Sequence, residues 1–190
     1  MAVIENGVDL DTLVFSKLAR QSNVSSFKCS AYRDLEDFLL NDALKYQDEN
    51  VAVTYLVHSD GRLVGFFSLA MGCVASESVA DLDGERYYPR RFPALLIARM
   101  ATQDNFRGFG IGKEMLARVF ATAFTLCSKV GCRVVKVDAK NNERTINFYK
   151  KHGGFITVGS GDGETVPMIV DINKMPPNHL DIEKTLVDFT

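Results

Sequence analysis

The sequence runs Pro93-Ala-Leu-Leu-Ile-Ala-Arg-Met-Ala-Thr102 and then, after four intervening residues, Arg107-Gly-Phe-Gly-Ile-Gly112, and this stretch decides the fold. Its first part is a short apolar run bounded by proline and polar residues, which is typical of a buried strand. After the glycines, apolar residues recur at three- and four-residue spacing, as on a helix face that packs on a sheet. These residues are Met115, Leu116, Val119, Phe120, Ala123, Phe124 and Cys127. The region 93–130 therefore predicts a strand, a glycine turn and a long helix.

The glycine turn between this strand and helix indicates a site for an anion. The first amides of a helix lack partners within the helix, and a turn without side chains lets a phosphate approach them. Two commoner phosphate motifs do not match: a P-loop requires glycine at Arg107 and Ser or Thr at Glu114. The dinucleotide fingerprint, read from Gly108, requires glycine at Lys113. The remaining pattern is Arg-x-x-Gly-x-Gly, which starts at Arg107.

The residues after the turn complete a recognisable combination. An alternating strand is predicted at 133–139, followed by a helix that starts after Asn142, carries Tyr149 and ends at Gly154-Phe155. Turn, strand and helix together resemble the GNAT superfamily of N-acetyltransferases over residues 27–171. In that superfamily the glycine turn holds the pyrophosphate of acetyl-coenzyme A (acetyl-CoA). The segment from Phe27 also looks like the branch that includes the acetyltransferase toxins of bacterial toxin–antitoxin pairs.

The resemblance implies an α/β (α+β) fold, with one mixed, mostly antiparallel, twisted sheet flanked by helices and a coenzyme cleft where the central strands splay. It implies a single GNAT domain over residues 1–190, with 175–190 as a C-terminal tail. It assigns coenzyme binding to Met100, Ala101, Thr102, Arg107, Gly108, Phe109, Gly110, Ile111, Gly112 and Asn142.

Tyr149 is the implied catalytic residue, a general acid that protonates the departing thiolate of coenzyme A. Phe148 beside it is the expected core residue, because the two rings cannot both face inward. Asn142 has two roles open to it, capping its helix or bonding the coenzyme. No general base is identifiable, and its absence favours an α-amine acceptor, since an α-amine with a pKa of about 7.7 to 8.0 is already partly neutral.

The rest of the chain predicts further helix and strand segments. Asp60-Gly61 between two apolar runs is a strong hairpin signal. Acidic residues in the first turn and an apolar stripe predict a helix from Asp34 to Gln47. Thr12 to Leu18 is either a strand or a short helix. The expected hairpins pair 51–58 with 62–71 and 155–158 with 165–172, and a polar loop is expected from Ser76 to Arg91.

Composition is that of an ordinary globular chain. The 190 residues are 46% hydrophobic and 24% charged, which excludes a disordered chain. The sequence contains no apolar run long enough to span a bilayer, and its first residues do not form a signal peptide, so we expect a cytoplasmic protein without membrane contact. The four cysteines lack zinc-site spacing and histidine partners, so we expect no metal.

The charge is distributed unevenly along the chain. Residues 86–151 contain 14 Lys and Arg against 4 Asp and Glu, although the whole chain has a net charge of −2. A ligand rich in phosphate, such as coenzyme A or a larger polyanion, explains this segment. The alternative is a solvated helix face.

Three functions remain open at the level of sequence. The first is acetyl transfer from acetyl-CoA to the amine of a small molecule or protein, directly in a ternary complex. The alternative is a toxin-type enzyme that modifies the amino group of aminoacyl-tRNA and is neutralised by an antitoxin. The third is a coenzyme-binding module without activity, against which the presence of Tyr149 argues. The expected partners are acetyl-CoA and an amine acceptor, with tRNA and an antitoxin under the alternative, and a homodimer is left open.

Overall fold

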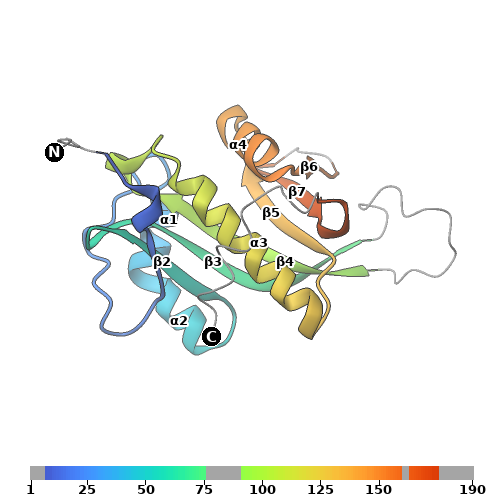
Figure 1. Cartoon of the computed structure of the whole chain (residues 1–190), viewed down its shortest axis with the longest axis horizontal. Coiled ribbons are helices and arrows are strands. Elements are labelled where there is room, and N and C mark those ends of the chain that lie inside the picture. Colours follow the sequence, from blue (N-terminus) through green and yellow to red (C-terminus); the bar gives the residue numbers. More distant parts are fainter. Residues whose placement is uncertain (1–6, 76–90, 160–162, 176–190) are drawn as a thin grey trace, which may run out of the picture. The chain divides into compact units, whose positions relative to one another are not determined.

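The fold combines one β-sheet with helices, as seen in a computed structural model that describes residues 7–75, 91–159 and 163–175 (Figure 1). Its strands are β1 (Val14–Lys17), β2 (Val53–Ser59), β3 (Arg62–Ala75), β4 (Arg91–Thr102), β5 (Val134–Lys140), β6 (Ile156–Thr157) and β7 (Thr165–Asp171). They form one sheet in the order β1-β2-β3-β4-β5-β7-β6. β4 pairs in parallel with β5, while β2 pairs antiparallel with β1 and β3, and β7 with β5 and β6. The predicted mixed, mostly antiparallel sheet is confirmed.

Four helices accompany the strands within the described residues. They are α1 (Arg33–Asp37), α2 (Ala43–Asp48), α3 (Ile111–Lys129) and α4 (Glu143–Gly153). A π-helical turn at Phe38–Asp42 joins α1 to α2, so the helix predicted from Asp34 to Gln47 is confirmed as one continuous helical stretch of three parts. The polar loop expected from Ser76 to Arg91 lies outside the described residues except for Arg91, which begins β4. The tail expected at 175–190 lies outside them from residue 176 onward.

The chain forms two compact units. Unit 1 comprises Met1–Leu69 and Arg99–Met115, and unit 2 comprises Ala70–Ala98 and Leu116–Thr190. Strands β3 and β4 and helix α3 therefore each contribute to both units.

In unit 1, the β2–β3 hairpin turns at Asp60 and Gly61, which have φ angles of 49° and 74°. Positive φ at both central residues is what a tight two-residue hairpin requires, so the predicted Asp-Gly turn is confirmed. The ambiguous stretch from Thr12 to Leu18 contains strand β1, preceded by a 3-10 turn at Leu10–Thr12. The core of this unit contains Leu18, Phe27, Cys29, Leu35, Phe38, Leu39, Ala43, Leu56, Leu63, Phe66 and Ala101.

In unit 2, α3 presents a stripe of buried side chains that includes Leu116, Val119 and Phe120, as the spacing predicts. Phe124 and Cys127, at the end of the stripe, are only half-buried. Helix α4 packs on β5, as Figure 1 shows. Strands β6 and β7 pair antiparallel and form the hairpin expected between 155–158 and 165–172.

Candidate functional site

The predicted anion-binding turn has the backbone geometry that its glycines suggest. Gly108 and Gly110 have φ angles of 89° and 86°, in the left-handed region that residues with a Cβ avoid. Helix α3 begins immediately afterwards at Ile111. The amides of Lys113 and Glu114 both donate to the carbonyl of Gly110, at 2.9 and 3.3 Å, which closes the first turn of the helix. The turn is therefore a strand-to-helix junction of the predicted kind.

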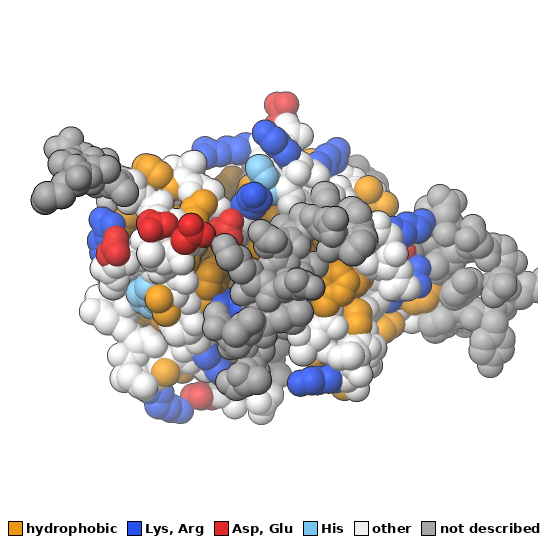
Figure 2. Space-filling view, viewed as in Figure 1, with side chains coloured by type: hydrophobic (Ala, Val, Ile, Leu, Met, Phe, Trp, Pro, Cys, Tyr) orange, Lys and Arg blue, Asp and Glu red, His pale blue; other side chains and the backbone are white. Residues whose placement is uncertain are grey.

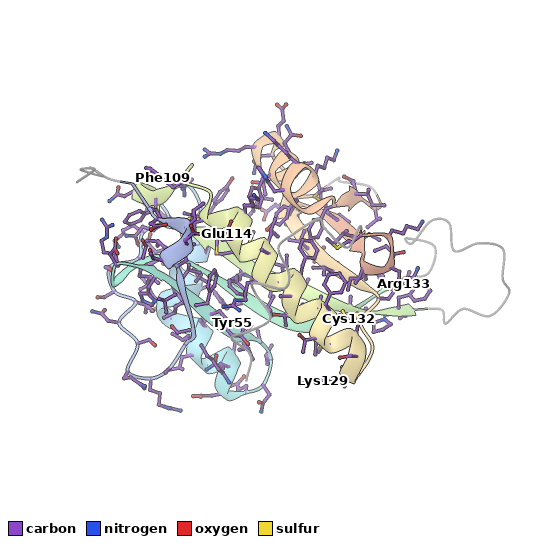
Figure 3. All side chains as sticks on the ribbon, in the orientation of Figure 1. Tyr55, Phe109, Glu114, Lys129, Cys132 and Arg133 are labelled. Carbon is purple, nitrogen blue, oxygen red and sulfur yellow. The ribbon has the colours of Figure 1, made fainter. Side chains whose placement is uncertain are left out.

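The amides of the turn make no hydrogen bonds to other backbone groups that the structure describes. Among the described residues, the five amides from Gly108 to Gly112 have no backbone acceptor. Phe109 lies on the outside of the turn and is 40% exposed, and Figure 3 labels it together with Glu114 on the start of α3. Gly108, Phe109 and Gly110 are exposed, whereas Ile111 is buried. Amides without an acceptor at the positive end of a 19-residue helix favour the binding of an anion such as a diphosphate.

Two close approaches hold this turn in unit 1. A Cβ added at Gly110 would lie 3.0 Å from a methyl group of Leu10, so the N-terminal 3-10 turn packs directly on the glycine. A Cβ added at Gly65 on β3 would lie 3.1 Å from the carbonyl oxygen of Ala101 and 3.4 Å from Ile111. Gly65 therefore lets the strand approach both the end of β4 and the first turn of α3.

The side chain of Arg107 is turned toward the protein. Its Nη2 donates to Asp104 Oδ1 at 2.8 Å and to Cys29 Sγ at 3.3 Å, and the side chain is 26% exposed. The pKa of the Cys29 thiol is raised by burial, an effect that the neighbouring guanidinium partly opposes. The arginine of the motif thus anchors the turn in this structure through Asp104 and Cys29.

Asp104 fixes the segment before the turn. Its Oδ2 accepts hydrogen bonds from the hydroxyl of Ser30 at 2.6 Å and from the Ser30 amide at 2.9 Å, while Oδ1 pairs with Arg107. The hydrogen bond from the Ser30 hydroxyl is the main cause that lowers the pKa of this carboxyl, followed by the Ser30 amide and, more weakly, the charge of Arg107. One carboxylate therefore ties the glycine turn to a segment 74 residues away.

The same segment is held from its other side by helix α1. Glu36 accepts from Lys28 Nζ at 2.7 Å and from the Cys29 amide at 2.8 Å, and the hydrogen bond from Lys28 lowers the pKa of this carboxyl. Gln103 Oε1 accepts from the Lys28 amide at 3.1 Å, and the Asp104 amide donates to the Lys28 carbonyl at 3.0 Å. Residues 28–30 thus connect α1 to the turn.

The three residues expected to bind the thioester arm end strand β4. The register between β4 and β5 runs from the Ala94–Val134 pair to the Ile97–Val137 pair, so Met100, Ala101 and Thr102 lie beyond its last pair. Ala101 is buried, and Met100 and Thr102 are half-buried.

Tyr149 is the buried aromatic residue of α4, which corrects the expectation that Phe148 would be the core residue. Tyr149 is 5% exposed and packs edge-on against Phe155 with ring centroids 5.3 Å apart, whereas Phe148 is half-buried. Burial raises the pKa of the Tyr149 phenol. The helix turns its tyrosine inward because Gly153 leaves space for Phe155, whose ring would lie 2.5 Å from a Cβ at that position.

Asn142 caps helix α4. Its side-chain oxygen accepts from the Thr145 amide at 2.9 Å, and the helix ends at Gly154, which has a φ angle of 66°. The capping role left open by the sequence is therefore present, and the role in coenzyme binding stays a prediction. The glycine that closes the helix also adopts the left-handed conformation typical of such ends.

The structure distributes the predicted residues over both units. Met100 to Thr102 and Arg107 to Gly112 lie in unit 1, while Asn142 and Tyr149 lie in unit 2. Sequence reasoning missed Ser30, Glu36 and Asp104. No local pattern marks them, because their partners are distant in the sequence or belong to the main chain.

Neither a metal centre nor a membrane span emerges from the described residues. They contain no group of three or more His, Cys, Asp and Glu side chains placed to hold a metal ion. Likewise, none of the helices in the described part of the chain has the length and apolar character needed to cross a membrane.

Comparison with known proteins places this arrangement in a family. Residues 16–155 match the Acetyltransferase (GNAT) family. The chain is 30% identical over 129 residues to the tRNA-acetylating toxin of Mycobacterium tuberculosis, a match that covers 67% of this chain and 75% of the relative.

Solved structures share the fold at lower identity. A mutant of KacT has a TM-score of 0.75 at 20% identity, covering 91% of this chain and 98% of that one. AtaT complexed with acetyl-methionyl-tRNAfMet has a TM-score of 0.74 at 19% identity, covering 85% and 95%. A mutant AtaT toxin bound to the C-terminus of the antitoxin AtaR and acetyl-CoA has a TM-score of 0.68 at 18% identity, covering 90% and 96%.

Proposed function

Because this chain belongs to the GNAT family of acetyltransferases, we propose that it transfers the acetyl group of acetyl-CoA to the α-amino group of an aminoacyl-tRNA. The acetyl-CoA-dependent N-acetyltransferase activity follows from the family. The acceptor is the part proposed here. A coenzyme-binding module without activity is not supported.

One observation carries the choice of acceptor. The relative with 30% identity, matched over 75% of its length, is a tRNA-acetylating toxin. This supports the alternative acceptor named from the sequence over the small molecule or protein amine that the sequence placed first. By the same relationship we propose that the chain acts as a toxin and is neutralised by a protein antitoxin.

The acceptor also suits the chemistry of the chain. Acetyl transfer forms a bond between nitrogen and the acetyl carbon, breaks the carbon–sulfur bond, and moves one proton from nitrogen to sulfur. An α-amine, with a pKa of about 8, is partly neutral near pH 7 and needs no strong base, whereas a lysine side chain with a pKa of about 10.4 does. The sequence presents no evident base, which is compatible with the weaker requirement.

We assign the coenzyme diphosphate to the amides of residues 108–112, and the thioester arm to the backbone of residues 100–102. Main-chain amides that point at a developing oxyanion stabilise the tetrahedral intermediate without reorganisation. The side chain of Arg107 contributes by holding the turn through Asp104 and Cys29.

Tyr149 is proposed to donate a proton to the sulfur as the thiolate leaves. Its pKa is raised by burial, so the phenol is protonated throughout the neutral range. A free phenolate would be disfavoured there, and we therefore expect the phenol to regain a proton from the attacking nitrogen within the same turnover. The net result is one proton moved from nitrogen to sulfur in two transfers through the phenol, without a separate acid and base.

Replacing the hydroxyl of Tyr149 tests the proposal. Tyr149→Phe keeps the ring in its contact with Phe155 and removes only the donor, so we expect kcat to fall about 10²- to 10⁴-fold while the affinity for acetyl-CoA is retained. The assay follows radiolabelled acetyl transfer to aminoacyl-tRNA, with the product identified by mass spectrometry. Tyr46→Phe makes the same chemical change at a residue that is 39% exposed, and serves as the matched control.

The pH dependence provides a second readout. Since the phenol stays protonated to at least about pH 10, the rate is expected to rise with deprotonation of the amine near pH 8 and not to fall again by about pH 9.

Full activity of Tyr149→Phe would remove Tyr149 from the mechanism. Turnover of small amines with none of any aminoacyl-tRNA would contradict the acceptor.

A further inference from the structure

Unit 1 contains a polar pocket that the coenzyme site does not use. Its volume is about 550 Å³, and its lining includes Asn23, Ser26, His58, Arg62, Gln103 and Phe106. These residues come from the loop before α1, from the β2–β3 hairpin and from the segment that joins β4 to the glycine turn. The lining contains no Asp or Glu among the described residues.

The fold leaves this pocket with hydrogen-bond donors. The side-chain oxygen of Gln103 already accepts from the Lys28 amide at 3.1 Å, which leaves its amide nitrogen for a ligand. The oxygen of Asn23 accepts from the amide and the hydroxyl of Ser25, at 3.2 and 2.7 Å, so this side chain also presents its nitrogen. Two amides that are usually both donor and acceptor therefore act here as donors.

Arg62 supplies the positive charge. Its guanidinium lies 5.2 Å from the centre of the Phe106 ring, an arrangement in which the ring contacts the guanidinium carbon and the N–H groups remain for an anion. The nearest carboxylate is that of Asp60 at 3.7 Å, in a pair whose side chains are 50% and 69% exposed. Such a pair is weak in water and is readily exchanged for a phosphate.

We propose that this pocket binds a phosphate group of the acceptor tRNA. An arginine and two donor amides without a lining carboxylate match an acceptor-rich anion, and phosphate is the anion that a polynucleotide repeats. The segment 103–106 lies between residues 100–102 and 107–112, so the pocket adjoins the segments assigned to the coenzyme. The inference rests on the proposed function for the identity of the RNA.

Direct binding measurements test the pocket without requiring acetyl transfer. Arg62→Ala is expected to weaken the binding of deacylated, fluorescently labelled tRNA about tenfold in anisotropy titrations, and to lower the slope of log Kd against log salt by about one. Calorimetric titration with acetyl-CoA should give an unchanged Kd. Arg20→Ala removes an exposed arginine of the same unit that pairs with Asp48 outside the pocket, and is the matched control.

A second variant tests whether removing a negative charge beside Arg62 strengthens the binding of tRNA. Asp60→Asn removes the competing carboxylate beside Arg62, so the affinity for tRNA is expected to rise about two- to threefold at low salt. Circular dichroism before titration shows whether each variant is folded. If Arg62→Ala alone fails to fold, the affinity of Asp60→Asn for tRNA still tests the pocket.

The possible results separate this inference from the proposed function. If wild-type protein acetylates aminoacyl-tRNA but Arg62→Ala binds tRNA as well as Arg20→Ala does, the pocket is wrong and the function stands. If Arg62→Ala weakens acetyl-CoA and not tRNA, the phosphate is that of the coenzyme, which also overturns the inference. If wild-type protein binds tRNA through Arg62 without acetylating it, the pocket stands and the proposed acceptor fails.

Discussion

At the scale of single residues, Asp104 is the least expected part of the site. The glycine motif draws attention to Arg107, yet the structure uses that side chain to join Asp104 and Cys29. Asp104 in turn takes both hydrogen bonds of Ser30. We therefore propose that it acts on the coenzyme indirectly, as a positioning residue for the amides that follow.

Asp104→Asn should therefore impair binding of the diphosphate specifically. We expect the KM for acetyl-CoA to rise about fivefold, which corresponds to about 1 kcal/mol for weakened charged hydrogen bonds at a partly exposed site. The kcat/KM for acetyl-pantetheine, which lacks the diphosphate, should stay unchanged, because the variant leaves intact the strand that we propose binds the thioester.

Asp48→Asn, the same substitution at an exposed carboxylate of the same unit, is the control. An equal loss with both donors would show that Asp104 supports the fold in general. The pKa of Asp104 is lowered in the folded protein, so its contribution is present above the unfolded pKa of about 3.9 and is lost only as pH falls through the lower folded value. The Asp104 carboxylate is therefore ionised, and its hydrogen bonds with Ser30 and Arg107 are retained, at the near-neutral pH of the assays.

At the scale of elements, the ends of helix α4 are set by its local sequence and its rotation is set by packing. The cap at Asn142 and the left-handed Gly154 define its ends, and both are readable from the sequence. Which aromatic residue faces inward is set by Phe155 after the helix and by the space that Gly153 leaves. The helix ends are local properties, whereas the rotation of the helix is a property of packing.

Two substitutions at Asn142 separate its two roles. Asn142→Ala should lower the free energy of unfolding by about 1 kcal/mol, since the Thr145 amide loses its acceptor, while Asn142→Asp should retain the cap. Urea denaturation measures this difference. If Asn142 also contacts the coenzyme, Asn142→Asp will keep its stability and still weaken acetyl-CoA binding; equal coenzyme affinity in all three proteins would leave the cap as its function.

At the scale of the whole molecule, the distribution of charge matters more than its sum. The chain carries −2 overall, but residues 86–151 have a strong excess of Lys and Arg. Helix α4 contributes Lys150, Lys151 and His152 in its last turn, and Figure 2 shows Lys and Arg side chains gathered over the region of this helix. A polyanionic acceptor would interact with such local groups even though the net charge is negative.

Salt should therefore affect the two substrates differently. If two to four phosphates of tRNA are neutralised on binding, the kcat/KM for aminoacyl-tRNA is expected to fall about ten- to hundredfold between about 50 and about 200 mM salt. Binding of acetyl-CoA, which we propose relies largely on backbone amides, should weaken much less. Steady-state rates over this range at saturating acetyl-CoA measure the first effect, and parallel slopes for both substrates would contradict the proposal.

Much of the fold follows from the sequence because its signals are local. The Asp60-Gly61 hairpin, the long helix after Gly112 and the capped helix after Asn142 each depend on residues within a few positions of one another. The glycine turn belongs to this class too, since positive φ and free helix amides require only the residues of the turn. The fold class, the geometry of the glycine turn and the family were therefore accessible before any coordinates, and the role of the turn in coenzyme binding stays a prediction.

Only the tertiary structure decided how the turn is held and which side chains face inward. The bonds of Asp104 to Ser30 and of Glu36 to Lys28 and Cys29, the inward position of Tyr149, and the donor pocket at Arg62 arise where segments distant in the chain meet. A hydrogen bond across 74 residues leaves no periodicity or spacing in the sequence. The backbone pattern is encoded locally, whereas side-chain partners are chosen by packing.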